Sequence, residues 1–404
     1  MDEPVSLARS SAGPALSWRA RFVLGQLDAG LRDGALQVDL PDGSRRVLGR
    51  GEPVARWILH KESALWRALV HGDIGFAESW MMGEWDTDDL TGLLMFMARN
   101  ERPGRDVVDG WAVLRWFDRL HHWTRRNTRD QSRRNIASHY DLGNDFYAAW
   151  LDASMTYSAG MFEHAEEPLE QAQARKYTHL ARLIGLAPGQ DVLEIGCGWG
   201  GFAEHALRAG ARVHGISLSR AQTDYARARL GALDPSGKAH KLEIRDYRDL
   251  EGQYDAIASI EMLEAVGEQY WPAYAEAIKK ALKPGGKAGI QTITIAPSRF
   301  ASYRRRPDFI QRYIFPGGML PTEPLLDRIF REAGLRVTGT VRFAEGYAAT
   351  LARWRERFEA AWPRLAGGGF DARFRRMWNY YLCYCEAGFR LGTIDVVQLR
   401  VEHA

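Results

Sequence analysis

The chain has 404 residues, of which 46% are hydrophobic and 26% charged, so it is long enough for two or more globular domains with large cores. The formal net charge of +3 is too small for a general nucleic-acid binder, and no nucleic-acid partner is expected. Three cysteines do not suit a disulfide framework, the N-terminal residues lack the apolar core of a secretory signal, and no apolar run reaches the roughly 20 residues of a membrane-spanning helix, so we expect a cytoplasmic protein.

Short elements broken by Gly, Pro and Asp occupy the first hundred residues. "ALQVDLPDGSRRVLG" predicts a hairpin around Asp42 and Gly43, and "ESALWRALVHG" predicts a helix that ends at Gly72. Apolar spacing then predicts a helix over Leu90–Ala98. We expect a smaller, mainly helical N-terminal domain over residues 1–125.

The segment Arg99–Arg134 carries ten arginines against five acidic residues, interleaved with aromatic side chains. A second basic and aromatic stretch is "YRRRPDFIQRYIF", residues 303–315. Arginines facing anionic headgroups and aromatic rings at the interface would suit a membrane surface. A simple solvated face is the alternative, and both remain open from these residues alone.

A regular alternation of helices and strands begins at Ala172. Predicted helices are "AQARKYTHLARLIG", "GFAEHALRAG", "RAQTDYARARLG" and "WPAYAEAIKKALKPGG", and predicted strands are "DVLEIG", "RVHGIS", "KLEIRD", "YDAIASI" and "KAGIQTIT". This order is typical of a doubly wound α/β domain. Two further helices are expected at Tyr347–Trp362 and Phe370–Leu391, and the domain is predicted over residues 126–404.

The loop "DVLEIGCGWGGF" places Gly196, Gly198 and Gly200 between a strand and a helix, where backbone N–H groups face a ligand. A dinucleotide enzyme would need an acid at the end of the next strand, and residues 213–222 contain none. Glu194 instead precedes the glycines, and Asp246 and Tyr247 follow the third strand. This arrangement resembles class I methyltransferases that use S-adenosylmethionine (SAM).

Eight ordered motifs make the resemblance more specific. They include "HYDLGNDFYAAWLDASMTYSAGMF", "VLEIGCGWGGFA", "RYIFPGGMLP" and "FRRMWNYYLCYCEAGFR", and together they resemble the cyclopropane fatty acid synthase family over about residues 60–395. The resemblance implies an enzyme that transfers a SAM methyl group to a cis double bond of a phospholipid acyl chain. It also implies a phospholipid bilayer as partner, a peripheral place at the inner membrane surface and no metal ion, with a homodimer as one alternative for the assembly.

The resemblance further implies which residues hold the cofactor. Tyr157 and Ser158 match a pair near the SAM carboxylate and sulfonium, and Ser217 and Gln222 fall where the family contacts ribose and methionine. Helix capping by the serine is the simpler alternative for Ser217. Asp246, with Tyr247 beside it, is the expected adenine contact.

In the family a bicarbonate ion serves as the base, held by a Glu, a His, a Tyr and a Cys. The Glu corresponds to Glu264 and the Tyr to Tyr347, which we expect to orient it. The His is replaced by Gln291 and the Cys by Ala159, so bicarbonate binding is in doubt. Glu261 stands where the family commonly has Gly, and either a second catalytic carboxylate or a salt bridge to an arginine would explain it.

Chemistry explains why acidic residues lie in the apolar stretch "SIEMLEAVGE". Methylation of an alkene leaves a carbocation, so the site must exclude water and supply a base. Loss of a proton from the new methyl closes a cyclopropane ring, which is our first expectation for the product. Because Gln291 and Ala159 replace the His and Cys of the bicarbonate site, the alternative product is a methyl-branched or methyl-unsaturated chain. A non-catalytic lipid-binding relative is the remote alternative.

Overall fold

A computed structural model describes residues 16–101 and 142–404 and divides the chain into two compact units. Unit 1 comprises Met1–Trp116 and Asp371–Tyr380, and unit 2 comprises Phe117–Phe370 and Tyr381–Ala404. The predicted boundary at residue 125, and most of the basic segment Arg99–Arg134, lie outside the described residues. Among the residues described, no helix combines the length and apolar character needed to cross a bilayer.

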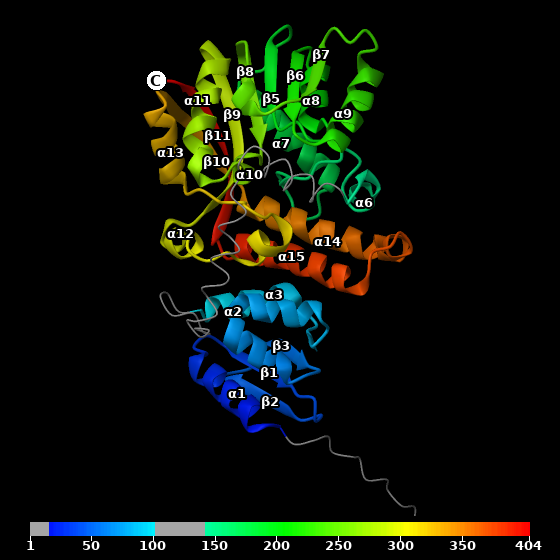
Figure 1. Cartoon of the computed structure of the whole chain (residues 1–404), viewed down its shortest axis with the longest axis vertical. Helices are drawn as coiled ribbons and strands as arrows, with labels where there is room; N and C mark the ends of the chain where they lie inside the picture. Colours follow the sequence, from blue (N-terminus) through cyan, green and yellow to red (C-terminus); the bar gives the residue numbers. More distant parts are fainter. Residues whose placement is uncertain (1–15, 102–141) are drawn as a thin grey trace, which may run out of the picture. The chain divides into compact units, whose positions relative to one another are not determined.

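Between residues 16 and 101, the described N-terminal part of unit 1 combines three helices with a small sheet of order β2-β1-β3-β4 (Figure 1). Its elements are α1 (Trp18–Gly30), β1 (Ala35–Asp39), β2 (Arg45–Gly49), β3 (Pro53–Leu59), α2 (Ser63–Met81), β4 (Trp85–Asp86) and α3 (Leu90–Arg99). The predicted hairpin is confirmed, since β1 pairs antiparallel with β2. The prediction that a helix ends at Gly72 is only partly right: Gly72 has φ 61° and ψ −139°, and a second helical segment follows at once.

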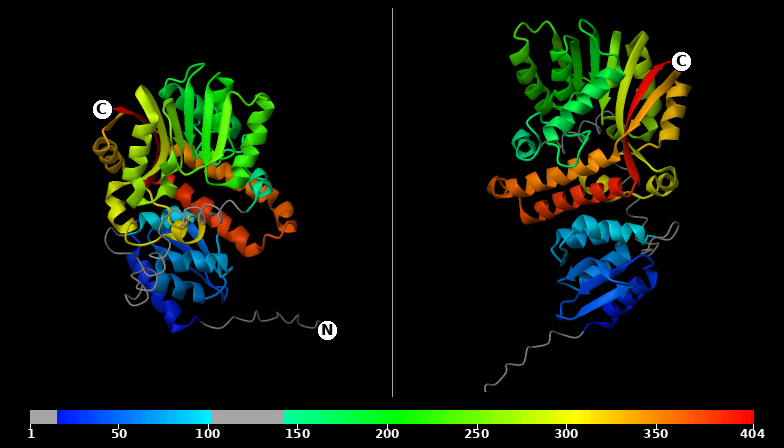
Figure 2. Two further views of the ribbon diagram at one scale, coloured as in Figure 1. Left: turned by 45° about the horizontal axis from the view of Figure 1, so that its top comes forward. Right: turned by 180° about the vertical axis from the view of Figure 1, so that it is seen from behind.

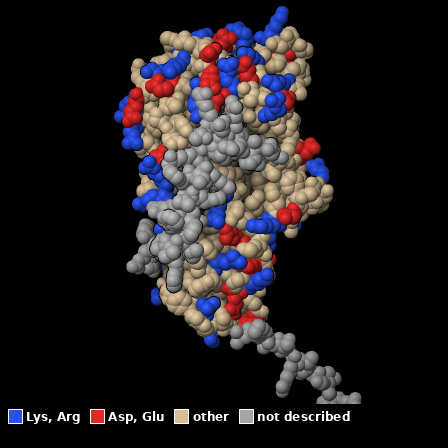
Figure 3. All heavy atoms as spheres, in the orientation of Figure 1, with Lys and Arg blue, Asp and Glu red and all other residues tan. Residues whose placement is uncertain are grey.

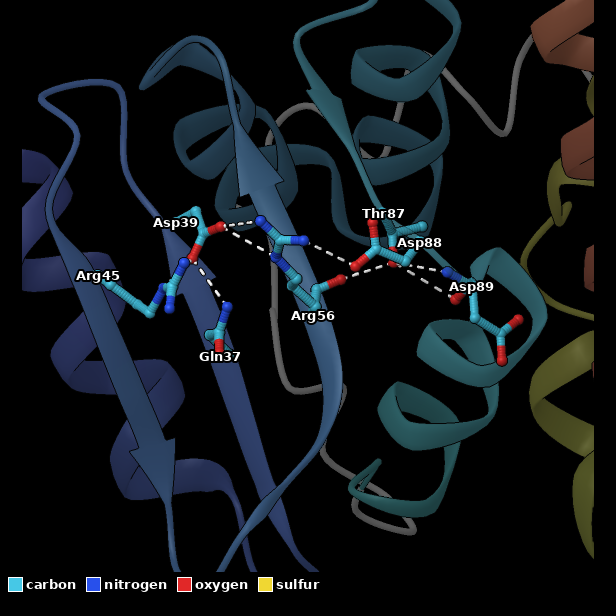
Figure 4. Close-up of polar contacts among 7 residues, drawn as sticks. All are labelled: Gln37, Asp39, Arg45, Arg56, Thr87, Asp88 and Asp89. Atoms are coloured by element: carbon cyan, nitrogen blue, oxygen red, sulfur yellow. Dashed lines mark hydrogen bonds and ion pairs between the residues drawn. The ribbon is translucent and has the colours of Figure 1, made fainter.

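Packing and ion pairing both stabilise this small sheet. Trp57, Phe76 and Trp85 are buried together, with ring centroids 4.4 to 6.1 Å apart. Figure 4 shows Arg56 of β3 between Asp39 of β1 and Asp88, with Arg56 Nη1 2.8 Å from the Asp88 carboxylate. The aromatic side chains form the core of this sheet. Arg56 links β3 to β1 through Asp39 and to the segment after β4 through Asp88.

Unit 2 is built on a seven-stranded sheet of order β10-β11-β9-β8-β5-β6-β7, with helices on both faces (Figures 1 and 2). Strands β5 to β9 are parallel, and β11 runs antiparallel to both of its neighbours. The strands are β5 (Asp191–Ile195), β6 (Arg212–Ser217), β7 (His240–Ile244), β8 (Tyr254–Ile260), β9 (Leu282–Ile295), β10 (Leu335–Arg342) and β11 (Ile394–His403). The prediction of a doubly wound α/β domain is confirmed.

The helices of unit 2 cover a core on each face of the sheet. The helices and short helical turns are α6 (Asn144–Ala148), α7 (Leu169–Leu183), α8 (Gly201–Arg208), α9 (Arg220–Leu233), η1 (Tyr247–Asp249), α10 (Leu263–Val266), η2 (Glu268–Tyr270), α11 (Trp271–Ala281), α12 (Pro297–Tyr303), η3 (Ile310–Ile314), α13 (Glu323–Glu332), α14 (Ala344–Gly367) and α15 (Ala372–Arg390), whose first residues belong to unit 1. Alternate residues of β5 point to opposite faces, so Leu193 joins the core under α11 and α13 while Val192 joins the core under α7, α8 and α9.

Candidate active site

A cavity lies at the carboxyl edge of the sheet, where β5 sits between β6 and β8 and the strand order reverses. Its lining comes from the ends of four strands and from the segment before α7, and includes Gly196, Ser217, Asp246 and Glu261. This edge is where ligands bind in open α/β sheets. The sheet thus gathers residues that are far apart in the sequence.

The glycine loop has the backbone that its sequence predicts. Gly196, Gly198 and Gly200 have φ values of 83°, 50° and 82°, a region that side chains rarely adopt. A Cβ on Gly196 would stand 2.8 Å from the side chain of Met262, whereas no described atom lies within 4 Å of a Cβ on Gly198. Gly198 therefore faces open space, and the loop can approach a ligand closely.

Glu194 is the acid that precedes this loop. It is 3% exposed, and its Oε2 atom has no hydrogen-bond partner among the described residues. Burial raises the pKa of Glu194 to about 8, although the backbone amide of Ala203 partly offsets that effect. A buried carboxyl with a free oxygen is suited to a cationic ligand group, such as the ammonium or sulfonium of SAM.

Ser217 and Gln222 lie together at the end of β6. Both are buried and line the cavity, and the Ser217 hydroxyl lies 3.5 Å from Gln222 Oε1. The side chain that caps α9 belongs to Ser219, which accepts a hydrogen bond from the Gln222 amide. The alternative that Ser217 is merely a helix cap is therefore wrong.

Asp246 and Tyr247 follow β7 and also line the cavity. The Asp246 carboxylate accepts hydrogen bonds from the backbone N, Nε and Nη2 of Arg248, at 3.0, 2.8 and 2.5 Å. Arg248 thus fixes this carboxylate at the cavity wall.

Tyr157 and Ser158 come from the segment before α7 and line the same cavity. The Tyr157 hydroxyl lies 2.8 Å from that of Tyr381, and Lys176 Nζ donates to the Ser158 hydroxyl at 2.5 Å. Burial lowers the pKa of Lys176 to about 7, although nearby carboxylates, Glu261 foremost, favour its charged form. Lys176 thus holds Ser158 in place; the motif "LEQAQARKY" that contains Lys176 is one of the eight ordered motifs, but it did not predict this contact.

Glu261 lies at the end of β8 in a complete set of hydrogen-bond donors. Its Oε1 accepts from the backbone N of Ala159 at 2.9 Å and from Gln291 Nε2 at 2.8 Å, and its Oε2 accepts from the Tyr347 hydroxyl at 2.6 Å. Burial raises the pKa of Glu261, and these hydrogen bonds partly offset it. These partners include no arginine, so the salt-bridge explanation for Glu261 is not what the structure shows.

The backbone of Glu261 is unusual as well. Its φ is 50°, and Met155 is the other non-glycine residue with positive φ among the described parts of the chain. A left-handed conformation costs about 1–2 kcal/mol for a residue with a side chain. Its persistence at a carboxylate that lines the cavity indicates a functional constraint at this position.

Glu264 occupies a different place from the one we expected. The sequence pairs it with Tyr347, but that hydroxyl donates to Glu261. Glu264 Oε1 accepts from Thr292 Oγ1 at 3.0 Å and from the Ile293 backbone N at 2.5 Å, while its Oε2 has no hydrogen-bond partner among the described residues. Burial, with the nearby charge of Glu261, raises the pKa of Glu264 to about 8.

Gln291 is held by a buried relay that sequence reasoning missed. Its Oε1 accepts from Gln398 Nε2 at 2.9 Å, and Gln398 Oε1 lies 2.6 Å from His179 Nδ1. Since Oε1 of Gln291 must accept, its amide nitrogen is the atom that faces Glu261. Gln398 lies on the antiparallel strand β11, where the sequence shows only ordinary alternation.

Aromatic rings surround Tyr157 and Tyr347. The Trp354 ring lies 5.2 Å from the Tyr157 ring and 6.1 Å from the Tyr347 ring, and Phe389 stacks on Tyr347 at 4.4 Å. Phe315 lies 6.5 Å from Tyr157. Such a wall excludes water and presents π-faces, which favour a nearby cation.

The chain is similar in sequence to enzymes that modify fatty acyl lipids. The family model described as mycolic acid cyclopropane synthetase matches residues 127–399. A tuberculostearic acid methyltransferase, UfaA1 of Mycobacterium tuberculosis, is 42% identical over 90% of this chain and 86% of its own length. A cyclopropane-fatty-acyl-phospholipid synthase of Escherichia coli is 34% identical over 82% of this chain and 84% of its own.

A solved structure gives the same result. The mycolic acid cyclopropane synthase CmaA1, in complex with SAH and CTAB, is 28% identical, with a TM-score of 0.59. The similarity covers 67% of this chain and 97% of that one.

Proposed function

Since the chain belongs to the mycolic acid cyclopropane synthetase family, and is thus a SAM-dependent methyltransferase of fatty acyl lipids, we propose that it methylates the cis double bond of unsaturated phospholipid acyl chains. The observation that carries the proposal is the half-buried Glu261, which lines the cofactor cavity and accepts a hydrogen bond from Tyr347 within a group of aromatic rings. An alkene needs no base to become a nucleophile, but the cation formed from it needs a dry site and a proton acceptor. Both are present.

The cofactor cavity has groups suited to each part of SAM. We propose that Glu194, Gly196, Gly198 and Gly200 contact its methionine end, with Tyr157 and Ser158 nearby. The ribose contacts would be Ser217 and Gln222, and the adenine contacts Asp246 and Tyr247. When bound, SAM supplies an electrophilic methyl group on its sulfonium sulfur. The residues of this chain orient it, exclude water and receive the proton.

For the product, we propose a methyl-branched chain that first carries a methylene or an adjacent double bond. The similarity to a tuberculostearic acid methyltransferase supports this choice, as do Gln291 and Ala159 at the positions of His and Cys in the resemblance. Three hydrogen bonds to the Glu261 carboxylate lower its basicity, so it removes a proton more slowly. Slower proton loss gives time for a hydride shift to the more stable tertiary cation, which has no ring-closing path of its own.

Cyclopropane formation is the second candidate, and the 34% identity to a cyclopropane-fatty-acyl-phospholipid synthase favours it. Expression in a host that lacks such enzymes, followed by mass spectrometry of its fatty acids, separates the two. Both products are heavier by one methylene group, but only the unsaturated product is cleaved by ozone, giving a ketone or aldehyde at the modified carbon. An ozone-resistant product would contradict the methyl-branched proposal and support the ring.

We also propose that the enzyme works at a membrane surface. Exposed aromatic side chains of unit 1, Trp18 at 67%, Phe22 at 53% and Trp66 at 43%, support this. The Arg19 guanidinium lies 5.6 Å from the Trp18 ring and 5.7 Å from the Trp66 ring. Tryptophan and arginine together are typical of surfaces that enter the headgroup region. Basic and acidic side chains are interspersed on the face seen in Figure 3, so apolar insertion, more than charge, would drive binding there.

A further inference from the structure

The Glu261 carboxylate occupies the place of an exchangeable anion. We infer that Glu261 is the base of the reaction. The family resemblance implies bicarbonate as the base, but this enzyme needs none. The inference rests on the proposed function and assigns its proton acceptor.

The hydrogen bonds of Glu261 show that bicarbonate does not fit. The resemblance places an anion between Tyr347, the residue at 291 and the residue at 159. Here the Tyr347 hydroxyl, Gln291 Nε2 and the Ala159 backbone N all donate to Glu261. A second anion would find these donors occupied and would meet a like charge in a buried site.

The residue at position 291 points the same way. Gln291 cannot carry the positive charge that would hold a free anion, and its amide orientation is fixed by Gln398. A tethered carboxylate needs less help, because its attachment to the chain removes the entropy cost of binding. The left-handed backbone of Glu261, with φ at 50°, delivers the carboxylate to this place despite the strain.

Glu261 retains the capacity to accept a proton. Its Oε2 accepts one hydrogen bond, from Tyr347, and keeps a second lone pair. After methyl transfer and the hydride shift, a C–H bond on a carbon next to the cationic carbon breaks, and its electron pair becomes the new C=C bond. In the second candidate no hydride shift occurs, and the C–H bond that breaks belongs to the new methyl group, which is attached to the carbon beside the cationic carbon. Its electron pair then forms the ring bond to the cationic carbon. The proton goes to Glu261, which becomes a neutral acid and returns the proton to solvent after turnover.

The test uses the full chain, SAM and vesicles of unsaturated phospholipid in carbon-dioxide-free buffer, with and without bicarbonate or formate. The wild type should keep its rate within about twofold in all buffers. Glu261→Gly, which relieves the backbone strain and empties the donor set, should lose about a hundred-fold or more and regain activity with either anion. Glu261→Gln fills the donor set with a neutral amide, and should be inactive without rescue.

A second readout does not depend on turnover. Binding of carbon-13 bicarbonate, followed by NMR with S-adenosylhomocysteine present, should be absent in the wild type and present in Glu261→Gly. If only Glu261→Gly binds bicarbonate but no methyl group is transferred to lipid, the proposed function is wrong, while the inference that Glu261 takes the place of bicarbonate still holds. A wild type that binds bicarbonate, or that slows several-fold without it, would overturn the inference, as would full activity of Glu261→Gly in anion-free buffer.

Discussion

Glu261 and Glu264, two half-buried acids separated by two residues, have different surroundings. Glu261 has three donors on its carboxylate, whereas Glu264 has two donors on one oxygen, and a pKa of about 8. Below that pH Glu264 is largely a neutral acid, so its conversion to an amide changes the charge little. Glu264 is therefore better suited to support the charge of Glu261 than to take the proton.

Glutamine substitutions at the two positions should separate these roles. We expect Glu261→Gln to slow product formation by about a thousand-fold, since general bases typically contribute about 10²–10⁴-fold. Glu264→Gln should slow it by only about tenfold, because Glu264 acts through Glu261. Calorimetric titration with SAM should show similar affinity in both variants. A greater loss in Glu264→Gln than in Glu261→Gln would return the role of base to Glu264.

Glu194 predicts a pH dependence of cofactor binding. Its pKa is raised to about 8 by burial, and a cationic ligand beside it would favour the carboxylate and lower that pKa. Binding then releases a proton below pH 8, so SAM affinity should rise by up to about tenfold per pH unit as the pH approaches 8, and level off above it. Calorimetry in buffers of different ionisation enthalpy measures the proton release. An affinity that falls with pH over this range would contradict the placement of the cation.

At the residue scale, the sequence predicted which positions gather at the cavity better than how they pair. Motif spacing brought Gly196, Ser217, Asp246 and Glu261 to one edge, because parallel strands end together. Which acid receives the Tyr347 hydroxyl depends on a backbone with positive φ at Glu261, and no spacing rule predicts that. Their roles in binding and catalysis remain predictions.

The glycine loop offers a test at the scale of an element. Alanine at Gly198 would add strain at φ 50° and place a methyl group in the open space that we assign to the cofactor. Gly237, with φ 64° and no described atom within 4 Å of an added Cβ, is the matched control on a loop outside the cavity lining.

Both alanine variants should lower the free energy of unfolding by about 1 kcal/mol. Only Gly198→Ala should also weaken SAM binding, by about tenfold or more, as measured by calorimetry. Equal SAM affinity in the two variants would remove Gly198 from the cofactor site.

The relay from His179 through Gln398 to Gln291 joins α7, β11 and β9. Gln398→Leu leaves Gln291 Oε1 without its buried donor and frees the amide to turn its oxygen toward Glu261. We expect a stability loss of about 1–3 kcal/mol, seen in denaturant unfolding, and a fall in turnover with little change in SAM affinity. Unchanged turnover would show that the relay does not position Gln291.

At the scale of elements, strong hydrophobic periodicity predicted helices and strands correctly, whereas segments with weak periodicity were assigned wrongly or missed. The helix expected at Leu90–Ala98 is α3, Leu90–Arg99, and the parallel strands match their apolar runs. The helix expected through "KALKPGG" instead ends at Ala281, because β9 begins at Leu282 and Pro284 and two glycines, which follow at once, disfavour a helix. Strands β10 and β11 and helix α13 were missed; β11 in particular is specified by pairing with both neighbours.

At the scale of the whole molecule, the two units suggest a division between membrane contact and chemistry, which remains a proposal. Trp18→Ser with Phe22→Ser should reduce flotation of the protein with anionic phospholipid vesicles by about tenfold, since two exposed aromatic side chains lose their apolar surface. Ile244→Ser, at a residue 39% exposed in unit 2, is the control and should float normally. Equal flotation of all three proteins would contradict this membrane surface.

The account as a whole depends on transfer of a carbon atom from SAM to the hydrocarbon chain of a phospholipid. Its most direct test gives the purified full-length protein SAM with a trideuterated methyl group and vesicles of unsaturated phospholipid, followed by mass spectrometry of the released fatty acids. We predict deuterium in the acyl chain, with two of the three atoms kept if Glu261 takes the proton from the new methyl group and all three kept if it takes the proton from a neighbouring carbon. Absence of deuterium from the acyl chains would contradict the account.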